Sequence, residues 1–272
     1  MKIVVFTDLH YRTDGADLLV DPDASLAAGI EHVNKHQQDA DLVVFTGDIA
    51  HTGEEQSYLD FKSRIASLTP PHALMIGNHD KREVFQQVFP EAPKDENGFV
   101  QQIIDHDDCR LILLDTLNAP PYDYPNFHFG NLCEHRLEWL RQALSSAGEK
   151  RCIIFMHHPP HETGFVSMDM IRLQNGPEFY EIVKAAGNVA HIVAGHVHRT
   201  ISGSHEGIPF SIFKSTTTQM PMLFDVMDFH LETPEPPAYG IIDVRPQSVL
   251  VHTEDYGLSD LDDLRANASM QI

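Results

Sequence analysis

Short apolar runs with little polar alternation recur along the first part of the chain. They occupy residues 3–6, 42–45, 73–76, 111–114, 152–155 and 191–194. Runs of this length and composition are typical of strands that are buried on both faces of a sheet. We therefore expect these segments to form the central strands of the fold.

Between several of these runs the apolar positions change to helical spacing. The segments are 23–37, 54–68, 133–144 and 177–186. In the first of them, Leu26, Ile30 and Val33 share one face, and Asp23 is placed to cap the helix. Alternating strands and helices predict an α/β sandwich.

After residue 198 the pattern becomes that of strands joined by turns, at 208–213, 239–244 and 248–252. The intervening segment 215–237 is rich in Met, Thr and Pro and has no clear period, which indicates a long loop or partial lid. The residues from about 259 are expected to form a mobile tail or a terminal helix. We predict a core of residues 1–205 and an extension of residues 206–272 that holds strands, a lid or oligomerisation segment and the tail.

Five motifs rich in potential metal ligands follow apolar runs. They are Asp8-Leu9-His10, Gly47-Asp48, Gly77-Asn78-His79-Asp80, His157-His158 and Gly195-His196-Val197-His198. If the chain stays extended, side chains two residues apart project to the same side, as in Asp8 with His10 and His196 with His198. Each motif alone is weak evidence, because Gly-Asp is a common turn and a single DxH occurs by coincidence. Together, oxygen and imidazole ligands after successive strands indicate a hydrolytic site that holds two divalent ions.

The composition limits the kinds of molecule that the protein is expected to bind. With 19 Lys and Arg against 40 Asp and Glu, the formal charge is −21, which disfavours nucleic-acid polymers and anionic membranes. The three cysteines form no CxxC pair, and no apolar stretch is long enough for a signal peptide or a membrane span. We expect a cytoplasmic protein.

In this order, the motifs resemble those of the calcineurin-like metallophosphoesterase superfamily over about residues 1–200. The resemblance is closer to its class III cyclic-nucleotide phosphodiesterase branch, which includes bacterial glycerophosphodiesterases. Further residues that resemble this branch are Asp48-Ile49 with Gly53 and Tyr58, the segment from Phe155 to Pro160, Met168-Asp169 and Asn175-Gly176. The resemblance implies a four-layer α/β/β/α sandwich with a small C-terminal β-rich extension.

The resemblance also implies a role for each motif residue. Asp8, His10 and His198 would hold one metal ion, Asn78, His157 and His196 would hold the other, and Asp48 would bridge both. His79 would contact the phosphoryl oxygens. His158 would either support the fold or lie next to the ligands without binding a metal ion. The family usually has Asn or Asp where this chain has His51.

Two divalent ions with only two anionic ligands keep a positive charge of about +2, which suits an anionic phosphate ester. The implied reaction is the attack of a metal-bridging hydroxide on a small phosphodiester, either a cyclic nucleotide or a glycerophosphodiester, with Asp48 and His79 as the catalytic residues. The ions could be Mn, Fe, Zn or Co. We also expect Arg12 and His161 to contact the substrate, and the apolar loop from Met220 to Phe229 makes a homo-oligomer plausible.

Two alternatives stay open from the sequence. A phosphomonoesterase or nucleotidase could use the same site. A non-catalytic metal-binding scaffold could keep the fold without the chemistry, although scaffolds of that kind are expected to lose ligands and all the expected ligand positions are filled here.

Overall fold

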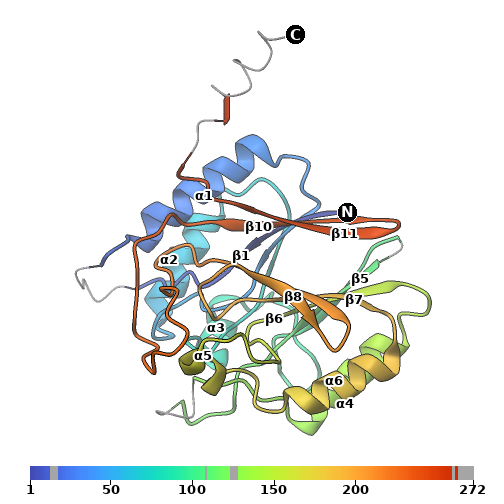
Figure 1. The fold of residues 1–272 in the computed structure, drawn as a ribbon. Helices are drawn as coiled ribbons and strands as arrows, with labels where there is room; N and C mark the ends of the chain where they lie inside the picture. Colours follow the sequence, from blue (N-terminus) through green and yellow to red (C-terminus); the bar gives the residue numbers. More distant parts are fainter. Residues whose placement is uncertain (13–17, 108, 123–127, 259–260, 263–272) are drawn as a thin grey trace.

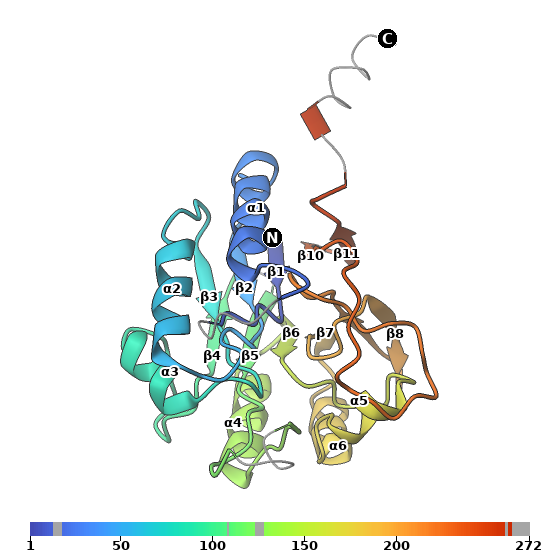
Figure 2. The same ribbon diagram turned by 90° about the vertical axis from the view of Figure 1, so that its left-hand side faces the viewer.

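Two β-sheets stack face to face in the computed structural model, with helices on their outer faces (Figures 1 and 2). The structure describes residues 1–12, 18–107, 109–122, 128–258 and 261–262. The strands are β1 (Lys2–Phe6), β2 (Leu42–Phe45), β3 (His72–Leu74), β4 (Gln102–Asp105), β5 (Cys109–Leu114), β6 (Arg151–Met156), β7 (Val189–Ala194), β8 (Ile201–His205), β9 (Ile208–Ile212), β10 (Tyr239–Arg245) and β11 (Ser248–Glu254). The helices are α1 (Pro22–His36), α2 (Glu55–Ile65), α3 (Arg82–Val88), α4 (Glu134–Ser145), α5 (Val166–Met170) and α6 (Gly176–Ala186).

The first sheet has the order β11-β10-β1-β2-β3, and the second has the order β4-β5-β6-β7-β9-β8. In the first, β1, β2 and β3 are parallel and β10 is antiparallel to β1. In the second, β5, β6, β7 and β9 are parallel. Because parallel strands end at the same edge of a sheet, the segments after β1, β2, β3, β6 and β7 can meet in one place.

Three apolar clusters define the layers. Val4 and Phe6 of β1 pack on α1 and α2, while Ile3 and Val5 face the second sheet. The opposite face of the second sheet packs on α4 and α6, as at Ile154. Since each sheet has one face on its partner and one on helices, the expected four-layer α/β/β/α order is confirmed.

The expected helices are present, with one difference at the start of the first. The expected cap Asp23 was wrong: the side chain of Asp21 accepts hydrogen bonds from the backbone N–H groups of Asp23 and Ala24. Pro22, with no N–H group and a fixed φ, suits the first helical position, so the cap is Asp21, two residues before Asp23. Asp23 instead accepts hydrogen bonds from Arg64 and from the Tyr11 hydroxyl.

The six early apolar runs form β1, β2, β3, β5, β6 and β7, and the hairpin turn after Arg245 joins β10 to β11. Residues 215–237 contain no helix or named strand, as expected of a loop. The predicted tail from residue 259 lies largely outside the described residues.

Two strands and two short helices were not predicted from the sequence. β4 alternates half-buried and exposed residues over four positions, and β8 is built from Ile, Ser, Gly and His. Both lie at or next to a sheet edge, where the apolar signal is weak. α3 and α5 are too short to show a helical period.

The division at residues 205 and 206 stays a prediction. Residues 208–254 contribute β9 to the second sheet and the β10–β11 hairpin to the first. No helix among the described residues is long and apolar enough to cross a membrane.

Candidate metal centre

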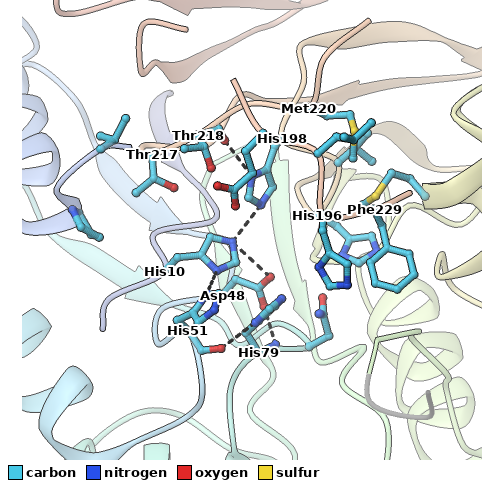
Figure 3. Close-up of a pocket in the computed structure, with 18 of the residues that line it drawn as sticks. His10, Asp48, His51, His79, His196, His198, Thr217, Thr218, Met220 and Phe229 are labelled. Carbon is cyan, nitrogen blue, oxygen red and sulfur yellow. Dashed lines mark hydrogen bonds and ion pairs between the residues drawn. The ribbon is translucent and has the colours of Figure 1, made fainter. Parts of the chain in front are cut away.

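The five motifs converge at one edge of the sandwich, where their strands end. Figure 3 shows His10, Asp48, His79, His196 and His198, from four of them, around the cavity. Asp8 and His10 follow β1, Asp48 follows β2, and Asn78 and His79 follow β3, all in the first sheet. His157 follows β6, and His196 and His198 follow β7, in the second sheet. The centre therefore lies where the two sheets meet, and both contribute ligands.

The backbone at five of these positions is left-handed. The φ angles are 54° at Asp8, 49° at His10, 51° at Asp48, 69° at His196 and 51° at His198. The extended conformation expected for Asp8-Leu9-His10 and for His196-Val197-His198 was therefore wrong. Non-glycine residues rarely adopt this region, and such strain is concentrated at functional sites. The side chains still come together, because these residues directly follow strands that end at the same edge of the sandwich.

One group of ligand atoms belongs to Asp8, His10 and His198, which could together hold a metal ion. Nε2 of His10 lies 2.9 Å from Nε2 of His198, which lies 3.4 Å from Oδ1 of Asp8. Two ligand atoms that each lie about 2.1 Å from one ion are roughly 3–3.5 Å apart, so this spacing fits a shared ion.

A second group surrounds His157. Its Nε2 lies 3.1 Å from Oδ1 of Asn78 and 3.2 Å from Oδ2 of Asp48. The same Asp48 oxygen is 3.9 Å from Nε2 of His10 in the first group. Asp48 therefore lies between the two groups, as a bridging ligand must.

The far nitrogens of two histidines fix which atom faces the centre. Nδ1 of His157 donates to the carbonyl of Thr46 over 3.0 Å, and Nδ1 of His198 donates to the carbonyl of Thr218 over 2.9 Å. A carbonyl can only accept, so in each neutral ring Nε2 keeps its lone pair for a metal ion. Nε2 of His196 is buried and has no hydrogen-bond partner among the described residues, which is the state expected of a ligand atom facing an ion.

Burial and the neighbouring carboxylates shift the pKa values of these histidines in opposite directions. Burial lowers the pKa of His196 to about 3 and holds that of His10 well below its usual range. Burial would also lower the pKa of His157, but the carboxylates of Asp48 and Asp8 raise it to about 9. Asp8 likewise raises the pKa of His198 against the effect of burial. Without a cation, the two carboxylates therefore favour the protonated form of both rings.

His79 is fixed at two points. Its backbone N–H donates to Oδ1 of Asp48 over 2.8 Å, and its Nδ1 donates to the carbonyl of His51 over 2.7 Å. Its ring packs edge-on against His10, at 4.7 Å between centroids, and lines the cavity. The remaining nitrogen, Nε2, is the atom of His79 that could reach a substrate.

Asp80 connects two of the ligand loops, a role not predicted from the sequence. Its carboxylate accepts hydrogen bonds from the backbone N–H groups of Gly77, Ile49 and Ala50 and from the hydroxyl of Tyr58. Burial and the neighbouring Asp48 raise the pKa of Asp80 to about 6. Its place as the last residue of the Gly77-Asn78-His79-Asp80 motif was the available signal.

The segment after β9 also supports the centre. Ser215 Oγ donates to the carbonyl of Asp8 over 2.7 Å. The fully buried amide of Gln219 donates to the carbonyls of Ser215 and Thr217 and accepts from the N–H of Ser215. The sequence showed here only a loop rich in Thr, and hydrogen bonds of this kind have no periodic signature.

Three further histidines lie close to the centre. Nδ1 of His51 is 3.3 Å from Nδ1 of His10, His158 pairs with the hydroxyl of Thr116, and His128 lines the cavity. His51 groups with His10 and His79, and His158 groups with His157 and His196, as possible metal-binding sets. Neither was among the expected ligands.

The two residues expected to contact substrate lie in different places. Arg12 lines the cavity. His161 does not: its ring is buried, pairs with the Tyr180 hydroxyl over 2.8 Å and packs on Phe210. The structure therefore gives no support to substrate contact by His161.

The centre opens into a cavity of about 350 Å³. Its walls come from the ligand loops, the segment 18–22, the neighbourhood of α5 and the segment 217–232. The loop expected to be a lid thus supplies part of the cavity wall. The cavity is large enough for a small organic phosphate.

These features define a hydrolase of the two-metal class, and the comparisons identify the family. The chain belongs to the calcineurin-like phosphoesterase family, whose model matches residues 1–200, as the sequence predicted.

Among curated proteins, the chain is 40% identical to a probable cyclic nucleotide phosphodiesterase of Rhodopseudomonas palustris, over 93% of this chain and 91% of that protein. It is 33% identical to a probable glycerophosphodiester phosphodiesterase of Arcobacter nitrofigilis, over 73% and 72%. It is 30% identical to a 3',5'-cyclic adenosine monophosphate phosphodiesterase of Pseudomonas aeruginosa, over 85% and 80%.

Solved structures agree in fold. A dimetal phosphatase from Danio rerio superposes with a TM-score of 0.70 at 14% identity, over 93% of this chain and 95% of that one. A purple acid phosphatase from yellow lupin superposes with a TM-score of 0.67 at 13% identity, over 96% of this chain and 52% of that one.

Proposed function

We propose that this protein hydrolyses small phosphodiesters at a centre of two divalent metal ions. The observation that carries the proposal is the position of Asp48, whose Oδ2 lies 3.2 Å from Nε2 of His157 and 3.9 Å from Nε2 of His10. A single carboxylate oxygen between two imidazole groups suits a pair of ions that act on one phosphoryl group.

In this proposal, seven residues hold the ions. Asp8, His10 and His198 would hold one ion, Asn78, His157 and His196 would hold the other, and Asp48 would serve both. Such ions supply Lewis acidity and lower the pKa of a bound water toward neutrality. Imidazole, carboxylate and amide ligands suit Mn, Fe, Zn and Co.

The remaining chemistry belongs to His79. Its ring is oriented by the His51 carbonyl and its backbone by Asp48, so Nε2 is presented to the cavity in a fixed direction. Because Nδ1 already carries a proton, Nε2 accepts in the neutral ring and donates only in the doubly protonated ring. In that form it can donate a hydrogen bond to a phosphoryl oxygen or a proton to the leaving oxygen, an effect of about 10²–10⁴-fold for a positioned acid. Arg12, which lines the same cavity, can contact the anionic substrate.

The relatives support the diester as substrate. The named activities of three of them concern cyclic nucleotides or glycerophosphodiesters, both of which are phosphodiesters. We therefore favour these two substrate classes over a phosphomonoester. The filled ligand set argues against a non-catalytic scaffold.

The test is turnover of bis(p-nitrophenyl) phosphate by protein stripped with a chelator and then reconstituted with Mn²⁺. We expect activity only after reconstitution, and at least tenfold faster than with p-nitrophenyl phosphate. Faster turnover of the monoester would favour the phosphatase alternative. No metal-dependent turnover of either ester would refute the enzymatic proposal.

A further inference from the structure

The wall of the cavity beyond the ligand loops is largely apolar. Met168, Met220 and Phe229 contribute to it, together with Leu19 and Leu231. Figure 3 shows Met220 and Phe229 beside His196. Arg12, Glu232 and two threonines are the polar exceptions beyond the histidines, Asp48 and Asn78.

The two segments that supply Met168 and Met220 to the cavity wall also carry exposed apolar residues. On α5, Met168 is 6% exposed and lines the cavity, whereas Met170 is 61% exposed. On the adjoining loop, Met220 is 6% exposed and Met222 is 56% exposed. In each segment, residues two positions apart thus face inward and outward.

The two segments that carry these residues are joined to each other. The backbone N–H of Val166 donates to the carbonyl of Phe224 over 3.1 Å, and the rings of Phe165 and Phe224 lie 4.8 Å apart. Figures 1 and 2 both show α5 beside the loop. We call this surface the apolar rim; it comprises Val166, Met170, Met222, Leu223, Phe224 and Met227, all exposed.

An exposed apolar surface of this kind in a chain of charge −21 indicates a binding function. A small polar alcohol such as glycerol gains nothing from the apolar wall or from the rim. A compact group would fill the cavity and leave the rim in water, whereas an alkyl chain can lie along both. Each buried methylene would strengthen binding about fourfold.

We propose that the preferred substrates are phosphodiesters in which one alcohol carries a long apolar chain that follows the wall of the cavity onto the apolar rim. The proposal rests on the diesterase function above and names the class of ester. Glu232 on the same wall disfavours a second anionic group on that alcohol.

The test compares diesters that share one leaving group. Glycerophosphocholine, butylphosphocholine and octylphosphocholine, each kept below its micellar concentration, all release choline on hydrolysis at the choline ester. We expect kcat/KM to rise at least tenfold from the glycerol to the octyl compound, with the butyl compound between them. A glycerol compound equal to or better than the octyl compound would overturn the proposal.

Substitutions on the apolar rim test whether the alkyl chain of the substrate lies there. Met222→Ser with Met227→Ser alters exposed side chains, so the fold should persist, and the ratio of octyl to butyl turnover should fall at least threefold. The matched control is Leu59→Ser, an exposed leucine on α2, which should leave that ratio as it is. An unchanged ratio in the rim variant would remove the rim from the proposal and contradict it.

A binding measurement tests the preference for an apolar chain without relying on turnover. The metal-loaded protein is titrated calorimetrically with ethyl, butyl and octyl methylphosphonate, which carry the same monoanionic head. Affinity that rises with chain length in a protein that cleaves no diester would refute the diesterase function alone. Affinity that does not depend on chain length would refute the inference alone.

Discussion

The carbonyl of Thr218 accepts a hydrogen bond from Nδ1 of His198 over 2.9 Å, although the two residues lie on different segments. That carbonyl is held by a loop whose own support is the buried amide of Gln219. The orientation of His198 toward Asp8 therefore depends on residues that bind no metal.

Gln219→Leu is expected to leave buried backbone groups of Ser215 and Thr217 without their partners. We expect the free energy of unfolding to fall by about 1–3 kcal/mol and metal affinity at one of the two positions to fall about 10–100-fold. Chemical denaturation and metal titration would measure these effects. Gln38→Leu, at an exposed position, is the control and should change neither.

Asn78→Ala and His79→Ala should separate metal binding from chemistry. Removing the Asn78 oxygen beside His157 should lower the occupancy of one ion from about one per chain toward zero. Removing the His79 ring should reduce kcat about 10²–10⁴-fold and leave two ions bound. Elemental analysis beside turnover would decide, and metal loss in the His79 variant would contradict this division of roles.

Asp80→Ala should disturb both ligand loops at once. Four hydrogen-bond donors from Gly77, Ile49, Ala50 and Tyr58 would lose their shared acceptor in a buried place. We expect a loss of stability of about 2–4 kcal/mol, together with weaker metal binding. Tyr58→Phe removes one of these donors and should show a smaller loss; an equal loss would mean that Asp80 does not act through the loops.

The pH dependence of metal binding follows from His157. Its pKa of about 9 in the metal-free protein means that an ion must displace a proton at neutral pH. Affinity should therefore rise from pH 7 to 9, with close to one proton released per chain from this group. Calorimetry at pH 7 in buffers of different ionisation enthalpy would count the protons.

The stability of the metal-free protein should change with pH in the opposite sense. The pKa of His157 is raised on folding, so its stabilising contribution is complete below about pH 6.5 and is lost as the pH rises through about 9. Thermal unfolding of the chelated protein should show this decline, and His157→Asn should remove most of it.

The sequence predicted the parts of the fold that rest on periodicity and on side-chain chemistry. Buried strands such as β1 and β2 are continuous apolar runs, and ligands such as Asp8 and His196 follow strands directly. The sequence did not show the left-handed turns at these ligands, because φ is set there by tertiary packing. It also did not show Gln219 as a support, since its partners are backbone groups that only the folded loop assembles.

His161 is a residue that the sequence placed in the site and the structure places elsewhere. It stands four residues after His157, and this proximity in sequence suggested a place in the site. Pro159 and Pro160 intervene, and the chain leads His161 away to Tyr180 and Phe210. Distance along the chain is therefore a poor guide to distance in space once the strand has ended.

The pairing of β1 with β10 has a consequence for the order in which the molecule is made. Lys2 pairs with Asp243, and the carbonyl of Asp8 accepts a hydrogen bond from Ser215, so β1, which pairs with β2 on one side, needs partners on its other side that are synthesised late. During translation β1 can pair with β2 early, but its antiparallel partner β10 is made only after most of the residues described here. Metal capture at Asp8 and His198 is then a late event, and a chain interrupted before residue 215 would leave the ribosome without a competent centre.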